Sequence, residues 1–348
     1  MKKRKVAVLG ATGAVGQRFV QLLDGHPWFT VSALTGSERT VGRTYQQGCR
    51  WVLPGDMPTW AAELPVLPSE PGLDAEVIFS ALPSEKAQSV ESDFAAADYQ
   101  VFSNAAAHRA AADVPLLIPE VNSEHAALVD AQRNRRGWNG CIVTNSNCTA
   151  AGVTISLKPL LNVFGLRRVF VVSLQAISGA GYPGVAALDL TDNVVPFIEG
   201  EEEKLETEPL KMLGSCDRDR VMPADFGISA HCNRVAVSDG HVVCVTVELG
   251  RPASPAEVRD AMDSFVPPQA VRELPSSPPQ VLSVRRENDR PQPRRDRDAG
   301  FGMTTVVGRV RADNLLHIRY VVLSHNTIKG AAGGSLQNAE LLLAKGLV

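Results

Sequence analysis

Residues 4–16 read RKVAVLGATGAVG, and this stretch decides the fold that we expect at the start of the chain. Residues 4–9 are a short apolar run typical of a β-strand, and the turn GATGAVG connects it to a helical pattern that begins at Gln17. This order is typical of a dinucleotide-binding unit, because the glycines allow a tight turn and the pyrophosphate lies on the N-terminus of the helix. The spacing is GxxGxxG rather than GxGxxG, so a glycine-rich turn with a purely structural role is also compatible with it.

Strand-like and helical segments alternate after this unit. The strand-like runs cover residues 29–34, 75–83, 99–104 and 141–144, and helices are expected at residues 84–97 and from Ala150 onwards. This alternation predicts an α/β protein with a Rossmann-like, doubly wound parallel sheet, whose ligands bind at the C-terminal ends of the strands. After residue 166 the β-type runs become longer, which predicts a second, more antiparallel region.

The overall composition excludes several classes of protein. The 348 residues carry a formal net charge of −3, which argues against a nucleic-acid binder. No apolar run approaches the roughly 18 residues that a membrane-spanning helix needs, and the basic N-terminus continues directly into the first strand rather than into a signal peptide. The six cysteines show neither a CxxC pair nor zinc spacing, so we expect no metal site, no disulfide framework and a cytoplasmic location.

Some segments are assigned from their composition alone. Residues 41–74 and 130–140 are interpreted as irregular or loop-like, and residues 115–122 as a stiff, extended stretch. The acidic residues 197–211 predict a solvent-exposed helix. Residues 275–300 are rich in Pro and Arg, which by composition predicts a disordered linker.

The sequence TNSNCTA at residues 144–150 places a cysteine between a strand and a helix. At a helix N-terminus, unpaired N–H groups and the positive end of the dipole favour the thiolate form of Cys148. Asn147 and nearby main-chain N–H groups are candidates for holding an oxyanion beside the sulfur. A buried, inert cysteine is the competing interpretation of this stretch alone.

The end of the second strand bears on the choice of cofactor. NAD-specific sites usually place Asp or Glu there, where it binds the ribose 2′-OH. This chain reads TGSERT at residues 35–40, in which the hydroxyl groups and Arg39 suit a 2′-phosphate and Glu38 does not. We therefore expect NADP(H), with Ser37 and Arg39 at its 2′-phosphate; a solvent-exposed polar turn is the alternative.

Several spaced motifs together resemble the aspartate-semialdehyde dehydrogenase family, in the branch typical of archaea and fungi. Beside GATGAVG they are SNAAAHR at 103–109, VPLLIPEVN at 114–122, SNCTA at 146–150, QAISGAGYPG at 175–184, EEEK at 201–204, NRVAVSDGH at 233–241, RPQPRRDRDAGFGM at 290–303 and HNTIKGAAGGSLQNAELL at 325–342. The resemblance therefore covers nearly the whole chain. Its specific part is the combination of SNCTA, SGAGYPG and RVAVSDGH, whereas the glycine motif alone is weak.

The resemblance implies a reaction and the residues that carry it. The reaction is the NADPH-dependent reductive dephosphorylation of L-aspartyl-4-phosphate to L-aspartate-4-semialdehyde and phosphate, through a cysteine thioester. Cys148 resembles the nucleophile, His241 the general acid/base, and Gln175 the residue that orients the substrate or the nucleophile. Without the resemblance, His241 would be interpreted as a surface histidine without a catalytic role.

The implied ligand contacts divide into two groups. For the substrate, Arg234 resembles the carboxylate clamp, Glu201 the ammonium ligand, and Arg109 and Lys204 the phosphate ligands. Asn104 would lie near the phosphate or the nicotinamide, or serve only as a turn. The acidic run leaves the register of Glu201 and Lys204 open by a residue or two. The implied cofactor-binding residues are Gly10, Thr12, Gly13, Ala14, Val15, Ser37, Arg39, Ser80, Gly179 and Asn338.

The resemblance also implies the domain organisation. Residues 1–150 would form an NADP-binding Rossmann-like domain, to which a C-terminal helix at 328–348 returns, and residues 151–327 a mixed α/β catalytic and dimerisation domain. The protein would be a homodimer or a homotetramer, with residues 275–300 as an ordered arm. Malonyl-CoA reductase, or another acyl-phosphate or acyl-CoA reductase on the same scaffold, is the alternative function. A non-catalytic NADP-sensing interaction protein is the alternative from a different class.

Overall fold

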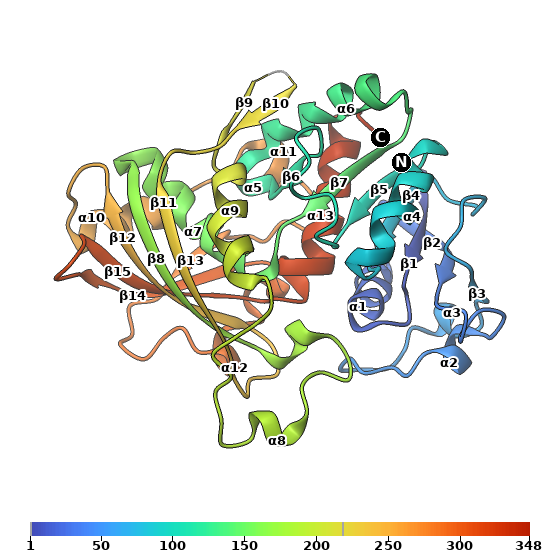
Figure 1. Cartoon of the computed structure of the whole chain (residues 1–348), viewed down its shortest axis with the longest axis horizontal. Helices are drawn as coiled ribbons and strands as arrows, with labels where there is room; N and C mark the ends of the chain where they lie inside the picture. Colours follow the sequence, from blue (N-terminus) through green and yellow to red (C-terminus); the bar gives the residue numbers. More distant parts are fainter. Residues whose placement is uncertain (1, 218) are drawn as a thin grey trace.

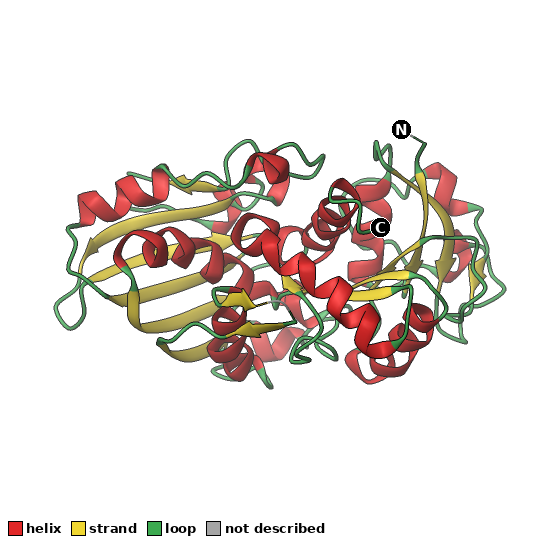
Figure 2. Ribbon diagram, turned by 90° about the horizontal axis from the view of Figure 1, so that it is seen from above, coloured by secondary structure: helices red, strands yellow, loops and turns green. Residues whose placement is uncertain are grey.

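The computed structural model describes residues 2–217 and 219–348. The N-terminal part and a long-stranded sheet lie side by side, with the C-terminal helix α13 (Gly333–Ala344) between them (Figure 1). Figure 2 shows the same two parts from above, with helices on the faces of both sheets. Within these residues, no helix combines the length and the apolar character that crossing a membrane requires.

The first sheet has seven parallel strands in the order β3-β2-β1-β4-β5-β7-β6. The strands are β1 (Arg4–Leu9), β2 (Phe29–Thr35), β3 (Val66–Leu67), β4 (Val77–Ser80), β5 (Gln100–Ser103), β6 (Leu116–Leu117) and β7 (Cys141–Asn145). Residues 6–9 of β1 are fully buried, as expected for a central parallel strand that is covered by helices on both faces. The predicted Rossmann-like, doubly wound sheet is therefore confirmed.

Helices and short turns connect these strands. They are α1 (Ala14–Leu23), α2 (Tyr45–Gly48), α3 (Thr59–Ala62), α4 (Ser84–Ala96), α5 (Pro119–Asn122), the 3-10 turn η1 (Ser123–Ala127) and α6 (Leu128–Arg136). Helix α6 corrects the loop that the polar composition of residues 130–140 predicts. Its few buried side chains include Gln132, which bonds the main chain of Asp113 and Ile142, so a polar residue attaches this helix to the sheet. Residues 119–122 likewise form a helical turn instead of continuing the extended stretch.

The second sheet has six strands in the order β11-β8-β12-β15-β14-β13. They are β8 (Leu166–Gln175), β11 (Gly227–Arg234), β12 (His241–Leu249), β13 (Leu282–Val284), β14 (Thr305–Ala312) and β15 (Ile318–Ser324). The two outer pairs are parallel and the three inner pairs are antiparallel, so the expected mixed sheet is confirmed. Apart from these strands, the region contains the elements η2 (Ile177–Ala180), α8 (Ala187–Leu190), α9 (Glu201–Met212), β9 (Ser215–Asp217), β10 (Arg220–Met222), α10 (Pro255–Asp263), α11 (Gln269–Arg272), α12 (Pro293–Asp296) and η3 (Ala299–Gly302).

Helix α7 (Cys148–Phe164) joins the two parts of the molecule. It begins directly after β7 of the first sheet, and its apolar side chains belong to the core of the second. A Cβ on Gly152 would lie 2.7 Å from Cβ of Ser324 in β15, so the helix backbone packs closely against the second sheet. The N-terminal end of α7 is therefore held at the edge of the first sheet, and the rest of the helix packs along the second sheet.

The end of the chain returns to the first sheet. The turn η4 (Ile328–Ala332) leads into α13, whose Leu336, Ala339, Leu341 and Leu342 lie in the same buried cluster as β1 and β4. On these contacts we propose a division into residues 1–150 with 328–348, and residues 151–327.

The segment 275–300 is ordered, although its composition predicts a linker. It contains β13 and α12, and the buried carboxylate of Asp296 accepts hydrogen bonds from Arg285, Arg290 and the main chain of Gln292. Two of the arginines that led to the prediction of disorder, Arg285 and Arg290, are thus paired with the buried carboxylate of Asp296. The expected ordered arm is confirmed.

Candidate active site

A cavity of about 530 Å³ lies where the C-terminal ends of the first sheet meet the second part of the chain. Its lining comprises Gly13–Val15, residues 81–84, residues 104–106, Arg109, Asn147, Cys148, residues 178–182, Glu201, Lys204, Asn326, Thr327, Gly330 and Ala331. Both parts of the molecule contribute to it. Side chains that the sequence associates with chemistry and the glycine turn that it associates with a dinucleotide thus share one cavity.

Cys148 lines this cavity, and His241 contacts its sulfur. The sulfur of Cys148, at the start of α7, is 3.2 Å from Nε2 of His241, at the start of β12. The other ring nitrogen, Nδ1, accepts a hydrogen bond of 3.0 Å from the main-chain N–H of Ala176. A main-chain N–H can only donate, so Nδ1 carries no proton and the neutral ring bears its proton on Nε2, which faces the sulfur.

The electrostatic surroundings of this pair differ from the sequence expectation. Burial raises the pKa of the Cys148 thiol to about 12, with a further increase from Glu201, and Arg109 and Arg234 only partly oppose this. Burial also lowers the pKa of His241 to about 3, together with Arg234 and His325. In the ligand-free site the thiol is therefore protonated and the imidazole neutral, in contrast to the thiolate that the position at a helix start suggested.

Asn147 is the N-cap of α7 and holds the start of this helix. Its side-chain oxygen accepts hydrogen bonds from the N–H groups of Thr149 and Ala150, at 2.9 and 3.1 Å. Its amide nitrogen donates to both carboxylate oxygens of Glu201, each at 2.9 Å. Both ends of the amide are occupied, so in this state Asn147 positions the turn rather than offering a free donor to an oxyanion.

The carboxylate of Glu201 forms hydrogen bonds with three side chains of the expected site. Besides Asn147, its carboxylate accepts hydrogen bonds from Nε2 of Gln175 at 3.2 Å and from Nζ of Lys204 at 3.1 Å. Gln175 is the last residue of β8 and is buried, whereas Glu201 and Lys204 come from the first turn of α9. The acidic run therefore contributes a buried carboxylate, and not only the solvent-exposed face that its composition predicts.

Arg234 is a buried guanidinium at the end of β11, directly opposite Gln175 in the parallel pairing with β8. Its Nη1 donates to the main-chain oxygen of Ala176 at 2.8 Å. Among the described residues it forms no ion pair with a carboxylate. A buried guanidinium without a carboxylate partner is suited to an anionic ligand. Gly179, which lines the cavity, packs against both Arg234 and His241.

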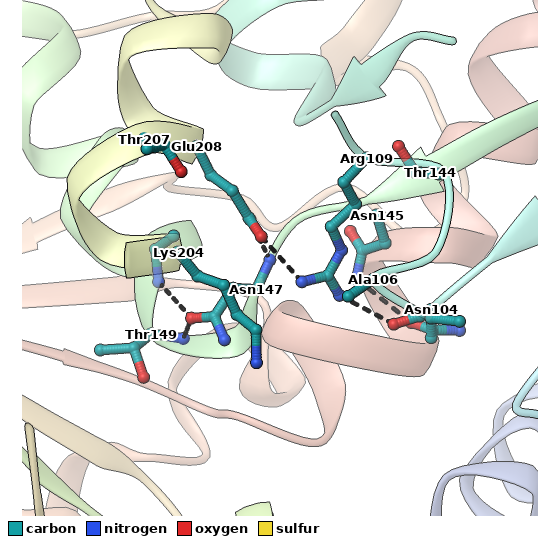
Figure 3. Close-up of polar contacts among 12 residues, drawn as sticks. Asn104, Ala106, Arg109, Thr144, Asn145, Asn147, Thr149, Lys204, Thr207 and Glu208 are labelled. Carbon is teal, nitrogen blue, oxygen red and sulfur yellow. Dashed lines mark hydrogen bonds and ion pairs between the residues drawn. The ribbon is translucent and has the colours of Figure 1, made fainter. Parts of the chain in front are cut away.

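Arg109 lies between two parts of the site, as Figure 3 shows. Its Nη1 donates to Glu208 at 2.9 Å and its Nη2 to the main-chain oxygen of Asn104 at 2.8 Å. Its Nε is buried and has no hydrogen-bond partner within the described residues. The side chain of Asn104 bonds the main-chain oxygen of Ser80 and the side chain of Asn145, so Asn104 is fixed at the edge of the cavity.

Glu208 and Asn145 belong to this constellation and were not identified in the sequence. Asn145, the last residue of β7, donates to the main-chain oxygen of Ala331 at 3.0 Å and so fastens the C-terminal segment to the cavity. Glu208 shares one face of α9 with Glu201 and Lys204, because residues i, i+3 and i+7 of a helix lie on the same side. That spacing is the signal in the sequence that could have found it.

The glycine turn fits a dinucleotide. Gly10 has a φ of +69°, and a Cβ there would lie 2.8 Å from the oxygen of Ala81. A Cβ on Gly16 would lie 2.2 Å from the oxygen of Gly10, so the first turn of α1 packs directly on the end of β1. The N-cap residue Gly13 has no side chain to satisfy the first N–H groups of α1, which leaves the helix start open to an anion in the cavity.

The structure brings only some of the expected cofactor residues to the cavity wall. Gly13, Ala14, Val15 and Gly179 line it, and Gly10 and Thr12 form the turn beneath them. Ser37 and Arg39 are exposed beyond the end of β2 and do not line it. Ser80 is buried at the end of β4, and the buried Asn338 donates to the main-chain oxygen of Leu117 at 3.4 Å. Neither of these two lines the cavity.

Comparison with known proteins accounts for both parts of the chain. Residues 5–129 match a family model described as the semialdehyde dehydrogenase NAD binding domain, and residues 157–329 match the semialdehyde dehydrogenase dimerisation domain. The aspartate-semialdehyde dehydrogenase of Archaeoglobus fulgidus is 51% identical over 344 residues, which are 99% of each chain. The chain belongs to the aspartate-semialdehyde dehydrogenase family.

Fungal members of the aspartate-semialdehyde dehydrogenase family are also similar over their full length. The enzyme of Saccharomyces cerevisiae is 41% identical and covers 100% of both chains. The crystal structure of aspartate-semialdehyde dehydrogenase with NADP from Candida albicans has a TM-score of 0.91, at 40% identity and 100% coverage of both chains. A Vibrio cholerae aspartate-semialdehyde dehydrogenase II complexed with ASA has a TM-score of 0.77, at 26% identity and 99% coverage of both chains. The resemblance to the archaeal and fungal branch is thus confirmed.

Proposed function

We propose that this chain catalyses the NADPH-dependent reductive dephosphorylation of L-aspartyl-4-phosphate to L-aspartate-4-semialdehyde and phosphate, through a thioester on Cys148. One observation carries the proposal: the sulfur of Cys148 lies 3.2 Å from Nε2 of His241. Cys148 lines the same cavity as the glycine turn at the start of α1 and the basic residues Arg109 and Lys204. The membership of the family supports it. We also propose NADP(H) as the preferred cofactor, which the similar Candida albicans crystal structure with NADP supports.

The sulfur of Cys148 adds to the acyl carbon of the substrate. The C–S bond forms, the C–O bond to the phosphate breaks, and phosphate leaves with the electron pair of that bond. When bound, NADPH supplies the hydride that reduces the thioester carbonyl. The C–S bond then breaks, the sulfur leaves with its electron pair, and a proton returns to it as the semialdehyde is released.

His241 handles charge and protons at the sulfur. In the described state its Nε2–H faces Sγ of the neutral thiol, since Nδ1 accepts from the N–H of Ala176, and the same N–H would stabilise negative charge that develops on the sulfur during the reaction. The ring can accept the thiol proton at Nε2 only in the other tautomer, for which Nδ1 must give up the contact with Ala176. We assign the general acid/base role to His241 with that change of tautomer as a required step.

The remaining side chains orient the substrate. Arg234, buried without an acidic partner among the described residues, binds its carboxylate, and Glu201 binds its ammonium group in place of one of the present donors. Arg109, whose Nε has no hydrogen-bond partner in the described part of the chain, and Lys204 bind the phosphate. Gln175 orients the substrate through its contact with Glu201, and Asn147 and Asn104 hold the turns at either side.

For the cofactor, we assign the pyrophosphate to the turn of Gly10, Thr12, Gly13, Ala14 and Val15. Ser37 and Arg39 bind the 2′-phosphate beyond the end of β2. Gly179 contacts the nicotinamide region. Ser80 and Asn338 support the neighbouring main chain from buried positions.

We further propose a homodimer or homotetramer in a reducing, cytoplasmic setting. The match to a dimerisation domain supports assembly, although it does not distinguish two subunits from four. All six cysteines are free thiols, and thiol catalysis at Cys148 needs a reduced sulfur.

The direct test is the phosphate-dependent reduction of NADP by L-aspartate-4-semialdehyde, with Cys148→Ala assayed beside the parent. We expect turnover in the parent, dependent on phosphate, and none in the variant. If the parent is inactive with this aldehyde but oxidises NADPH with malonyl-CoA, the substrate assignment is wrong and the acyl-CoA alternative replaces it. Binding of NADPH without turnover of either substrate would favour the non-catalytic NADP-sensing protein.

A further inference from the structure

We propose that Glu208 is a positioning residue of this site, which fixes the guanidinium of Arg109 against the turn that carries Cys148. The inference rests on the proposed function, because it concerns how the phosphate of that reaction is held. Glu208 is the eighth of the 12 residues of α9 and is 7% exposed. It reaches two segments that are distant in the sequence, and no other described side chain connects them in this way.

The carboxylate of Glu208 is a bridge. Its Oε1 accepts from Nη1 of Arg109 at 2.9 Å, and its Oε2 accepts from the main-chain N–H of Asn147 at 2.6 Å (Figure 3). Asn147 immediately precedes the nucleophile and caps its helix. The position of Arg109 relative to the sulfur of Cys148 is therefore set through this one carboxylate.

A second hydrogen bond fixes the orientation of the Arg109 guanidinium. Nη2 donates to the main-chain oxygen of Asn104 at 2.8 Å, so the planar guanidinium is held at two corners. Nε, which is buried without a partner among residues 2–217 and 219–348, is the N–H group that can donate to a bound phosphate oxygen. Glu208 thus orients the Nε–H edge of Arg109, the residue that binds the phosphate, and does not itself touch the substrate.

Two converging donors explain why this position needs a carboxylate. An ionised carboxylate accepts at both oxygens, whereas an amide accepts at one and donates at the other. In Glu208→Gln, the amide NH₂ would face either the guanidinium or the N–H of Asn147, and one of the two bonds is lost although the shape is kept. The substitution also leaves the charge of Arg109 uncompensated.

Glu203 provides a matched control. It lies on the same helix and its side chain is exposed, with no hydrogen bond or ion pair from its carboxylate among the described residues. Glu203→Gln makes the same chemical change without altering the bridge. We expect it to leave the kinetic constants within about twofold of the parent, as is usual for surface substitutions.

The experiment has two readouts, for Glu208→Gln, Glu208→Asp and Glu203→Gln beside the parent. The first is the KM for phosphate and the kcat in the semialdehyde-oxidising direction. The second needs no turnover: it is the rate at which iodoacetamide labels Cys148, followed by peptide mass spectrometry, at increasing inorganic phosphate. Circular dichroism and thermal unfolding establish that each variant is folded.

For Glu208→Gln we expect the KM for phosphate to rise about tenfold or more, as for the loss of a charge-assisted hydrogen bond, with a smaller change in kcat. The phosphate concentration that half-protects Cys148 should rise by a similar factor. Without phosphate, labelling should become about threefold faster, since the uncompensated charge of Arg109 favours the thiolate. A merely structural role would not combine faster labelling with weaker protection.

The proposal is overturned if a folded Glu208→Gln enzyme keeps the parent's KM for phosphate and its protection by phosphate. If Glu208→Gln does not fold, Glu208→Asp decides: the shorter side chain should raise the same two quantities by a smaller factor, and unchanged values contradict the bridge. An inactive parent would refute the proposed function, while the labelling readout would still test Glu208.

Discussion

A Cβ on Gly179 would lie 2.9 Å from Nη1 of Arg234. The same atom would lie 3.1 and 3.2 Å from Cε1 and Nε2 of His241. The absence of a side chain at this one position therefore allows a guanidinium and an imidazole to pack together directly against a residue of the cavity lining. The glycine belongs to the motif SGAGYPG, whose composition suggests only a flexible turn.

Gly179→Ala should therefore impair catalysis more than folding. The methyl group displaces the side chains of Arg234 and His241, and even a small displacement of a catalytic group lowers kcat/KM about 100-fold. Gly227→Ala is the matched control, because a Cβ at Gly227 meets no atom within 4 Å. Steady-state kinetics and thermal unfolding of both variants measure the effect; equal kcat/KM values would contradict the close packing at Gly179.

Arg234→Lys should weaken binding of the semialdehyde. Lysine keeps the charge but presents a single ammonium group, which cannot reproduce a bidentate contact with a carboxylate. We expect the KM for L-aspartate-4-semialdehyde to rise about tenfold or more. Arg167→Lys, at an exposed residue near the start of β8, serves as the control and should behave like the parent. A KM unchanged in Arg234→Lys would remove Arg234 from the substrate contacts.

The pH dependence of labelling tests the state of the nucleophile. Because burial raises the pKa of Cys148 to about 12, iodoacetamide should label the ligand-free enzyme slowly at neutral pH. Below that pKa the thiolate fraction, and with it the rate, rises about tenfold per pH unit without a plateau near pH 7. The exposed Cys244 is an internal reference in the same digest. A plateau near neutral pH would favour the thiolate that the helix start suggests.

The arm at residues 275–300 should depend on Asp296. Asp296→Asn removes the charge that compensates Arg285 and Arg290, and breaking a buried ion pair lowers the free energy of unfolding by about 3–5 kcal/mol. Urea unfolding measures this, and limited proteolysis should cut residues 285–298 faster in the variant. Asp289→Asn, an exposed neighbour, should change the free energy of unfolding by under about 1 kcal/mol.

The same carboxylate predicts a pH dependence. Burial raises the pKa of Asp296, but the hydrogen bonds from Arg290 and Gln292 outweigh it, so the folded-state pKa lies below the ordinary value. A carboxyl with a depressed pKa in the folded state stabilises above its unfolded pKa, near 3.9, and loses this stabilisation as the pH falls through the folded value. The parent should therefore lose more stability than Asp296→Asn on acidification below about pH 4. Equal losses would show that Asp296 is not ionised in the fold.

The sequence predicts the five central strands of the first sheet, because local patterns determine them, whereas the two-residue edge strands β3 and β6 lie in segments interpreted as irregular or merely extended. Each parallel strand is a short apolar run, and the turn at residues 10–16 marks the start of its first helix. The roles of His241, Gln175 and Arg234 could be assigned only through the resemblance, since these residues reach the site through strand pairing between distant segments: Cys148 and His241 are 93 residues apart, and Arg234 and its partner Ala176 are 58 apart. No pattern within a window of ten or twenty residues contains that information.

Composition gave wrong predictions where a polar or charged residue is buried with a hydrogen-bond partner. The helix at residues 128–136 looks like a loop because its sequence is polar, yet Gln132 is fully buried against the main chain of β7 and Asp113. Glu208 looks like part of a solvated acidic run, yet its partners are residues 109 and 147. A composition-based interpretation treats each polar residue as hydrated and cannot see the distant group that replaces the water.

The place of helix α13 has a consequence for how the protein is made. Leu341 and Leu342 are synthesised after every strand of the first sheet, yet they complete the same apolar cluster as Val6 and Val8. Until α13 has been made, the nascent N-terminal sheet exposes the face that this helix covers, so it cannot reach its native stability. Synthesis of α13, rather than of the strands alone, therefore completes the cofactor-binding half, and a chain interrupted before residue 333 should depend on chaperones or be degraded.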